Sequence, residues 1–466
     1  MKLLLPFITV SVLLFVGHYL RLHGKLFQKL YLPSSLLGGI VGLILYQTAK
    51  ALSINTLTIW FDGLTMLPAF LINIVFACLF IGVTLPSFKT VSKKAIPQLS
   101  YGQIVAWGQY MVGLGIFIFI ISKLWDMPAM FGAVIEVGFE GGHGTASGLA
   151  PTFELMNWPE GKDFALASAT VGIISAVLCG IVLINWANQK GYTHRSLQIE
   201  NIPEDETIGI IPIDRRPVAG YLSIHTDSLD AMSYHVAIVG IAVGIGYLLK
   251  EGLVTIISFF QAVLSTETYT SIITIVNSFP LFPLCMIGGL ITQLFAQRFD
   301  KHETIDIGLV RRIQNMSLDI LIVSAVAMIQ VVIVIQGIVP FTIMVIGGIL
   351  WNIFCLLVLA KRLLPDSWFE RAIAELGQSM GVTATGLMLL RIVDPDYKTN
   401  ALEAFAYKQL LHEPFMGGGI ITSMFVPLLG IGGIAMAYNL FCISIGAVLV
   451  WLTVLIVFKK FRYRSN

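Results

Sequence analysis

The feature that most constrains this chain is a succession of apolar runs, each about 18–25 residues long, the length at which one α-helix spans the hydrocarbon core of a bilayer. Only 12% of its 466 residues are charged, whereas soluble domains carry about 25%. A membrane β-barrel would show short segments of alternating hydrophobicity instead of continuous runs. We therefore predict an all-α polytopic membrane protein.

Eleven runs are predicted to be helices that cross the membrane. They cover residues 3–20, 33–49, 66–86, 100–122, 164–187, 231–249, 279–297, 315–336, 339–360, 409–430 and 433–458. Two further segments, 129–153 and 370–390, carry too many glycine and hydroxyl residues in their middle to cross as regular helices. Irregular backbone at membrane depth is tolerated only where it is buried in protein or lines a cavity. We predict that each is a re-entrant hairpin, which enters and leaves on the same side.

The basic residues give this layout an orientation. If the N-terminus lies outside, 24 of the 29 lysines and arginines fall in segments predicted to be cytoplasmic, as the positive-inside rule requires. Arg311, Arg371 and Lys408 are among them. The five exceptions are Lys2, Lys50, Lys123, Lys162 and Lys250. We therefore expect a multi-pass protein of the plasma (inner) membrane with a cytoplasmic C-terminus.

The predicted spans divide into two halves of opposite orientation, residues 1–187 and 231–430, each with five spans and one hairpin. "LPSSLLGGIVGLIL" in the first half resembles "FPLCMIGGLITQL" in the second, and "GGHGTASG" resembles "GQSMGVTATG". Residues 188–230 read as a polar cytoplasmic linker, and residues 431–466 as an extra span with a basic tail. Two inverted-topology repeats with interrupted helices at corresponding positions are typical of secondary transporters.

The two hairpin tips have the chemistry of a binding site. Where a helix breaks, its free N–H groups can bind a carboxylate, and its carbonyls and nearby hydroxyls can bind a small cation. An alternative is that these small residues serve only for close helix packing. The predicted substrate-binding residues are Gly141, Gly142, His143, Gly144, Thr145, Ser147, Ser379, Gly381, Thr383 and Thr385. His143 could be a proton carrier, a substrate ligand or a histidine with a structural hydrogen bond.

Acidic residues inside apolar spans are costly and are functional by default. The candidates are Glu136, Glu140, Asp319, Glu375 and Glu413. Asp319 and Glu413 are the first choices for a Na⁺ ligand or a proton site, and Asn315 and Ser317 could add neutral oxygens. We expect no metal centre beyond Na⁺, because Glu140 and His143 share a ligand-like spacing that the intervening glycines make flexible.

Other classes of function fit the sequence less well. No HExxH helix and no pair of GxGD motifs occurs, so we predict no enzyme and no cofactor. No basic face is interleaved with aromatic residues, so a nucleic-acid partner is not expected. A channel would need a continuous polar face along several helices, whereas the polar residues here concentrate at two tips.

At "GGHGT", Gly141 to Thr145, the chain resembles the bacterial glutamate:sodium symporter family. Further matches to the family's motifs are Pro33, Gly38, Gly39, Ala169, Thr170, Gly172, Asn315, Ser317, Gly377, Gly381, Thr383 and Thr385. The resemblance implies symport of L-glutamate with Na⁺ by a homodimer, in which a hairpin-bearing domain moves like an elevator against a scaffold. It also adds Thr170 to the candidate Na⁺ residues.

The chain departs from the family pattern around the same motifs. Glu140 stands where the family usually has Ser, Glu375 where it often has His, and Asp319 replaces a Ser, while Thr422 aligns with an intramembrane Asp. These departures keep an alternative open, the H⁺- or Na⁺-coupled transport of a di- or tricarboxylate on the same fold. Arg391 could bind a second substrate carboxylate or could equally be a cytoplasmic charge.

Overall fold

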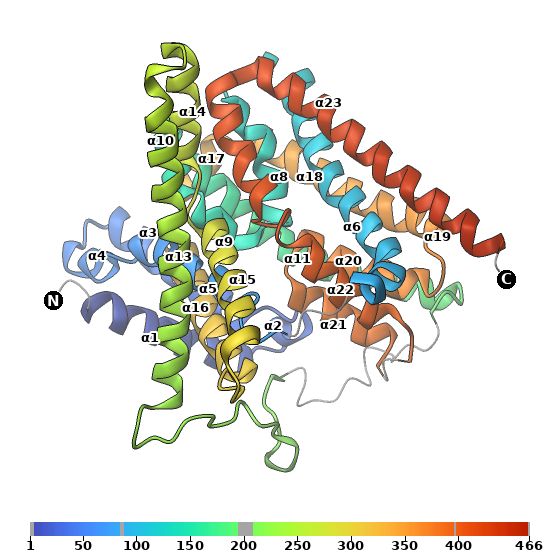
Figure 1. Cartoon of the computed structure of the whole chain (residues 1–466), viewed down its shortest axis with the longest axis horizontal. Coiled ribbons are helices and arrows are strands. Elements are labelled where there is room, and N and C mark those ends of the chain that lie inside the picture. The colour runs from blue at the N-terminus through green and yellow to red at the C-terminus, as the bar shows by residue number, and fades with distance from the viewer. Residues whose placement is uncertain (1–3, 84–87, 194–207, 396–397, 465–466) are drawn as a thin grey trace.

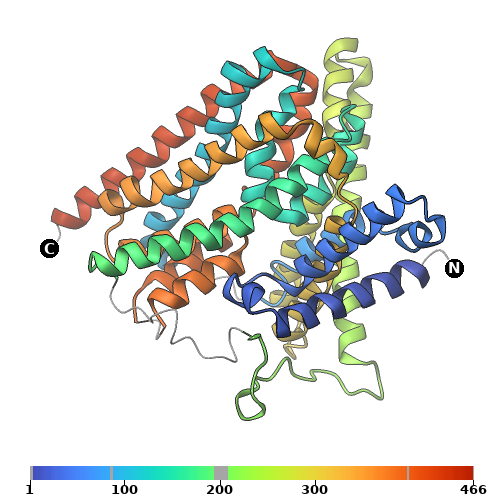
Figure 2. The ribbon, with the colours of Figure 1, turned by 180° about the vertical axis from the view of Figure 1, so that it is seen from behind.

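The computed structural model describes residues 4–83, 88–193, 208–395 and 398–464. These residues form helices and connecting segments, with no β-strand among them. The helices gather into two bundles that lie side by side (Figure 1), and a view from behind shows the same division (Figure 2).

The first bundle combines the first helices of both halves of the chain. Its helices are α1 (Leu4–His23), α3 (Ser34–Ala51), α5 (Met66–Ala77), α13 (Ala231–Phe259), α15 (Phe282–Phe299) and α16 (Ile307–Ala327). The short helices α2 (Lys25–Lys29) and α4 (Asn55–Phe61) flank α3, and α14 (Thr266–Ser278) packs against α13.

Two glycine pairs bring the helices of this bundle close together. Gly38 of α3 lies against the α1 backbone, and Gly288 of α15 lies against the α13 backbone in the same way. Their neighbours Gly39 and Gly289 face α16 and α5, respectively. A Cβ at any of the four would clash, so only glycine fits. The motifs that look alike in the two halves therefore do equivalent packing.

The second bundle holds both predicted hairpins and the helices around them. Its long helices are α6 (Phe88–Ile116), α11 (Gly161–Gln189), α18 (Ile338–Phe354), α22 (Ala401–His412) and α23 (Ile420–Arg464). Helices α6 and α18 both end in a π-helical stretch, Phe117–Ile121 and Cys355–Ala360, each followed by one helical turn, α7 (Ser122–Leu124) and α19 (Lys361–Leu363). The same irregularity thus precedes the hairpin in each half.

Both predicted hairpins are broken helices. In the second, α20 (Trp368–Met380) and α21 (Thr383–Val393) fold back on each other around Gly381 and Val382, with Gly377 packed on Gly386. In the first, the 3₁₀ turn Ala129–Ala133 leads into α8 (Val134–Phe139), and α9 (Gly142–Gly148) and α10 (Ala150–Leu155) follow the break. Gly142 adopts a φ of 67°, in the left-handed region that favours glycine. The sequence placed both breaks correctly.

Two predicted spans are each broken inside the predicted range. Residues 409–430 contain a break between His412 and Ile420, where Gly417 and Gly418 have φ values of 67° and 107°. Span 315–336 is also interrupted, because α16 ends at Ala327 and α17 (Val331–Gln336) follows. The predicted boundary after residue 430 coincides with a kink in α23 at Gly433.

Seven helices of the described chain are long and apolar enough to span a membrane, or eight if the bent pair α14 and α15 is one span. This establishes a multi-pass membrane protein. The full set of eleven crossings, their orientation and the inverted repeat remain predictions. Of the predicted linker 188–230, the described part includes a 3₁₀ turn, Ile213–Arg215, beyond the end of α11, and residues 194–207 lie outside the described residues.

Candidate functional site

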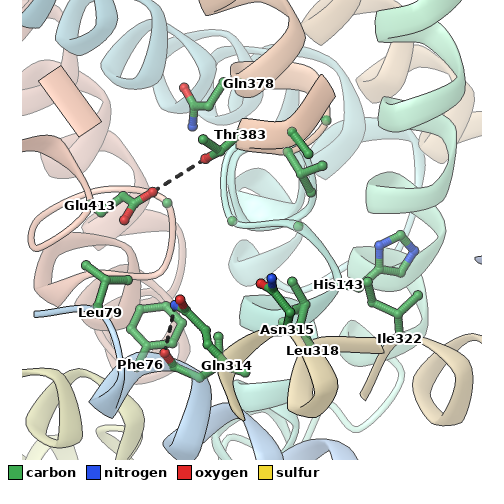
Figure 3. A pocket seen from close by; sticks show the side chains of 18 of the residues that line it. Phe76, Leu79, His143, Gln314, Asn315, Leu318, Ile322, Gln378, Thr383 and Glu413 are labelled. Atoms are coloured by element: carbon green, nitrogen blue, oxygen red, sulfur yellow. Dashed lines mark hydrogen bonds between the residues drawn. The ribbon is translucent and has the colours of Figure 1, made fainter. Parts of the chain in front are cut away.

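A cavity of about 420 Å³ lies where the two bundles meet (Figure 3). The first bundle contributes α5 and α16, and the second contributes the breaks of both hairpins and the loop after α22. Pockets of about 300–1,000 Å³ are usual for small-molecule sites. The lining residues include Phe76, Arg311, Gln314, Asn315, Glu140, Gly141, Gly142, His143, Gly144, Gln378, Gly381, Thr383, Glu413 and Gly417.

The α16 wall carries a positive charge and two amides. Arg311 donates through Nη1 to Gln314 Oε1 at 2.7 Å, and Gln314 donates through Nε2 to the Val75 carbonyl of α5 at 3.1 Å. The Gln314 bond holds one edge of the guanidinium while the Arg311 side chain stays exposed at the cavity. Asn315 lies beside them, so this wall can bind an anionic group.

The wall opposite is the break between α20 and α21. Thr383 begins α21, and the first N–H groups of a helix have no partner within the helix. Thr383 Oγ1 accepts a hydrogen bond from Gln409 Nε2 at 2.8 Å and lies 3.5 Å from Glu413 Oε1. The arrangement therefore places a helix N-terminus, a hydroxyl and a carboxylate at one end of the cavity.

His143 belongs to the cavity lining through the first hairpin, but its ring turns toward α11. Its Nε2 lies 2.9 Å from Thr170 Oγ1, and Thr170 itself donates to the Leu166 carbonyl. Because that hydroxyl proton is already used, Nε2 must be the protonated nitrogen that donates to Thr170. The geometry favours the structural role for His143 among the three considered.

Behind the hairpin breaks lies a buried ionic cluster that includes Lys408 of α22. Its Nζ lies 2.7 Å from Glu375 Oε1 and 3.9 Å from Glu140 Oε1. The side chains of all three residues have no exposed surface. Glu140 Oε1 also accepts from Gln378 Nε2 at 2.9 Å and from His412 Nε2 at 2.7 Å. Charged groups from both hairpins thus meet around one helix.

A second contact links the first hairpin to the start of α23. Glu136 Oε1 accepts from Thr422 Oγ1 at 2.6 Å, and Thr145 Oγ1 donates to the Gly417 carbonyl at 3.3 Å. The loop at Gly417 and Gly418 therefore packs directly on the break after α8. Thr422 is the position that aligns with an intramembrane Asp of the resembled family. Here the acidic group beside it is Glu136, which comes from α8.

The structure brings together only part of the predicted site. Gly141, Gly142, His143, Gly144, Gly381, Thr383, Asn315 and Glu413 line the cavity. The other candidates do not line it: Thr145, Thr170, Ser147, Ser317, Ser379 and Thr385 lie among the surrounding helices, and Asp319 is an exposed residue of α16. Ser379 Oγ donates to Asn352 Oδ1 at 2.9 Å. Arg391 does not line the cavity either.

Three important residues were missed because their charge was read as a cytoplasmic signal. Lys408 and Arg371 are buried within the second bundle, Lys408 completely and Arg371 with Nη2 2.6 Å from Asp366 Oδ1, so both charges have partners inside the protein. Arg311 faces the cavity. A usable signal for Lys408 was its place beside Gln409 and one turn before His412, within a segment predicted to be a membrane span.

Comparison with known proteins gives one match. The family model described as sodium/glutamate symporter matches residues 1–398, which extend from the first helix past α21. Helices α22 and α23, and with them Lys408 and His412, lie beyond the matched residues. No curated protein and no solved structure matched the chain.

Proposed function

The chain belongs to the sodium/glutamate symporter family, and from this membership we propose that it is a secondary active transporter, not an enzyme, that carries L-glutamate or a similar anionic amino acid into the cell with Na⁺. The observation that carries the proposal is the cavity between the bundles, because both broken hairpins reach it from one side and Arg311 from the other. Breaks of this kind bind substrates and ions in secondary transporters.

The charges around the cavity match the charges of an amino-acid dicarboxylate. Arg311 suits one carboxylate, because a guanidinium presents a planar set of donors to a carboxylate. The N-terminus of α21 at Thr383 suits the other, through its free N–H groups and positive dipole end. Glu413 suits the amino group. The substrate would then touch both bundles.

The coupling ion is proposed to be Na⁺, held by oxygens near the same breaks. Asn315 and Glu413 are the predicted ion ligands that line the cavity. Thr170, Ser317 and Asp319, predicted with them, do not line the cavity. A cage of mostly neutral oxygens suits a monovalent cation better than a divalent one.

The proposal extends to architecture. We propose two inverted repeats, residues 1–187 and 231–430, each with a re-entrant hairpin. The protein is further proposed to be a homodimer in which the second bundle of each protomer moves like an elevator against the first. The shared Gly-Gly packing and the shared π-helical stretch before each hairpin support the repeat. We also propose a plasma (inner) membrane location with the N-terminus outside.

A transporter of a di- or tricarboxylate is the second candidate. It is favoured by the fact that Arg311 and the α21 N-terminus can both bind carboxylates, which leaves Glu413 as the cavity group that selects an amino group. Selectivity between the two substrate classes therefore depends on one carboxylate.

The test is uptake into proteoliposomes. Purified protein would be given radiolabelled L-glutamate under an inward Na⁺ gradient and, separately, under K⁺ with an inward pH gradient. We expect accumulation with Na⁺ alone, lost in Thr383→Ala and kept in Thr342→Ala, an exposed threonine of α18. Accumulation of malate or citrate in place of glutamate would support secondary transport but reject glutamate as the substrate. The absence of gradient-driven uptake of any of these compounds would reject the transport function.

A further inference from the structure

We propose that the buried carboxylates between the two hairpins form a site for two cations: the ammonium of Lys408, built into the protein, and an exchangeable Na⁺ held by Glu136 and Glu140. The inference rests on the proposed function, because it concerns the ions that accompany transport through the same cavity. It goes beyond that function by giving α22 a fixed positive charge in place of a second exchangeable ion.

Lys408 has the surroundings of a bound alkali-metal ion. Its Nζ donates to the amide oxygens of Gln378 and Gln409 at 2.8 and 2.9 Å and lies 2.7 Å from Glu375 Oε1. Glu140 Oε1 follows at 3.9 Å. The ammonium is thus enclosed by oxygen atoms from α20, from α22 and from the end of α8.

The neighbouring helix α6 is shaped to hold this pair. Gly102 faces it, and a Cβ at that position would clash with the Lys408 stem and lie 2.6 Å from Glu375 Oε1. One turn earlier, Gln98 donates through Nε2 to Glu375 Oε2 at 2.9 Å. Space and a second donor are therefore provided for a lysine–carboxylate pair inside the bundle.

The hydrogen bonds fix His412 as neutral. The indole of Trp107 can only donate, and it donates to Gln103 Oε1 at 3.1 Å, so the Gln103 amide nitrogen points to His412 Nδ1 at 3.1 Å. Nδ1 must accept that bond, and Nε2 carries the proton that it donates to Glu140. His412 therefore adds no positive charge to the cluster.

The remaining negative charge lies at the end of α8. Glu136 and Glu140 are one helical turn apart, joined by the bond from Glu140 N to the Glu136 carbonyl at 3.0 Å. Oε2 of each is buried and has no hydrogen-bond partner among the described residues. An unpaired buried charge is costly, and the C-terminal end of a broken helix is where transporters bind Na⁺. Glu375 and Glu140 face the one lysine, Glu136 lies one turn from Glu140, and the two unpartnered Oε2 atoms favour a further cation here.

Other charged groups near the cluster do not fill this position. Glu413 lines the cavity and lies near Thr383, and Arg311 bonds Gln314 on α16. The phenols of Tyr101 and Tyr110 of α6 are buried in the same bundle, and Tyr110 faces Glu136, but neither side chain supplies a positive charge. Removing Lys408 while keeping Glu375 should therefore create a place for a second Na⁺, and removing the charge of Glu140 should abolish the first.

The experiment measures the ratio of ²²Na⁺ to L-[¹⁴C]glutamate taken up by proteoliposomes. We expect Lys408→Met to raise the ratio by one Na⁺ per glutamate and Glu140→Gln to lower it by one. The double variant Lys408→Met with Glu375→Gln should keep the wild-type ratio, because it leaves no unpaired charge. Lys361→Met, which alters an exposed lysine of α19, serves as the control.

A second readout needs no transport. The melting temperature in detergent is titrated with NaCl against choline chloride. Wild type should be stabilised by Na⁺, Lys408→Met more strongly, and Glu140→Gln more weakly than wild type. If Lys408→Met does not fold, the Na⁺ response of the melting temperature of Glu140→Gln and of the double variant tests the proposal. Na⁺ stabilisation that is undiminished in Glu140→Gln, or a folded Lys408→Met with unchanged Na⁺ binding, overturns the two-cation site. Stabilisation by Na⁺ without glutamate uptake rejects only the proposed substrate.

Discussion

Arg311 offers the sharpest test of how the cavity recognises its substrate. Arg311→Gln keeps a polar side chain and the neighbouring Gln314 but removes the charge. A hydrogen bond to a charged group contributes about 1.5–3 kcal/mol. Because the Arg311 side chain is exposed and water competes for it, the lower end of this range applies. Since about 1.4 kcal/mol corresponds to a factor of ten, we expect the KM for L-glutamate to rise about tenfold, with little change in the maximal rate.

The assay compares L-glutamate with L-glutamine, whose side-chain amide carries no charge. The preference for glutamate should fall by the same factor in Arg311→Gln. Arg312→Gln is the matched control, because Arg312 is the next residue, is also exposed and does not line the cavity. An unchanged preference in Arg311→Gln, or an equal loss in Arg312→Gln, would refute the assignment of a substrate carboxylate to this guanidinium.

Two further predictions concern packing and the Glu136 contact. Gly386→Ala should abolish uptake, because its Cβ would clash with the α20 backbone at the hairpin contact, whereas Gly244→Ala on α13, which points into open space, should be neutral. Thr422→Val should lower the stability by about 1.5–3 kcal/mol by leaving the Glu136 carboxylate without its hydroxyl donor. Thr453→Val, on an exposed face of α23, is its control. Melting in lipid nanodiscs measures the second effect, and no difference between Thr422→Val and Thr453→Val would contradict it.

Much of the fold could be read from local patterns. Long apolar runs predicted helices because a run of that length has few alternatives in a bilayer, and glycine-hydroxyl segments marked both hairpin breaks because such residues form poor helices. The prediction failed at residues 409–430, where the apolar average hid Pro414 and three consecutive glycines, Gly417 to Gly419. A break can therefore lie inside a run that is apolar overall.

The candidate site was less accessible to sequence reasoning, because its charges act through partners far away in the chain. Lys408 meets Glu375 of the second hairpin and Glu140 of the first. Nothing within one segment distinguishes such a lysine from one that faces the cytoplasm. Arg311 presents the same difficulty, since only the pairing of α16 with the hairpin breaks places it at the cavity.

The division of the cavity walls between two bundles has a consequence for how such a protein can change. Under the proposed function, the α16 wall with Arg311 binds one substrate carboxylate, while the ionic groups of the hairpins bind the ions that accompany it. Because the two sets lie on separate bodies, a substitution on α16 can alter selectivity without disturbing the Lys408 pair. Under the proposed function, recognition of the carboxylate at Arg311 and energy coupling can then diversify independently, and variants changed at Arg311 should retain the dependence on Na⁺.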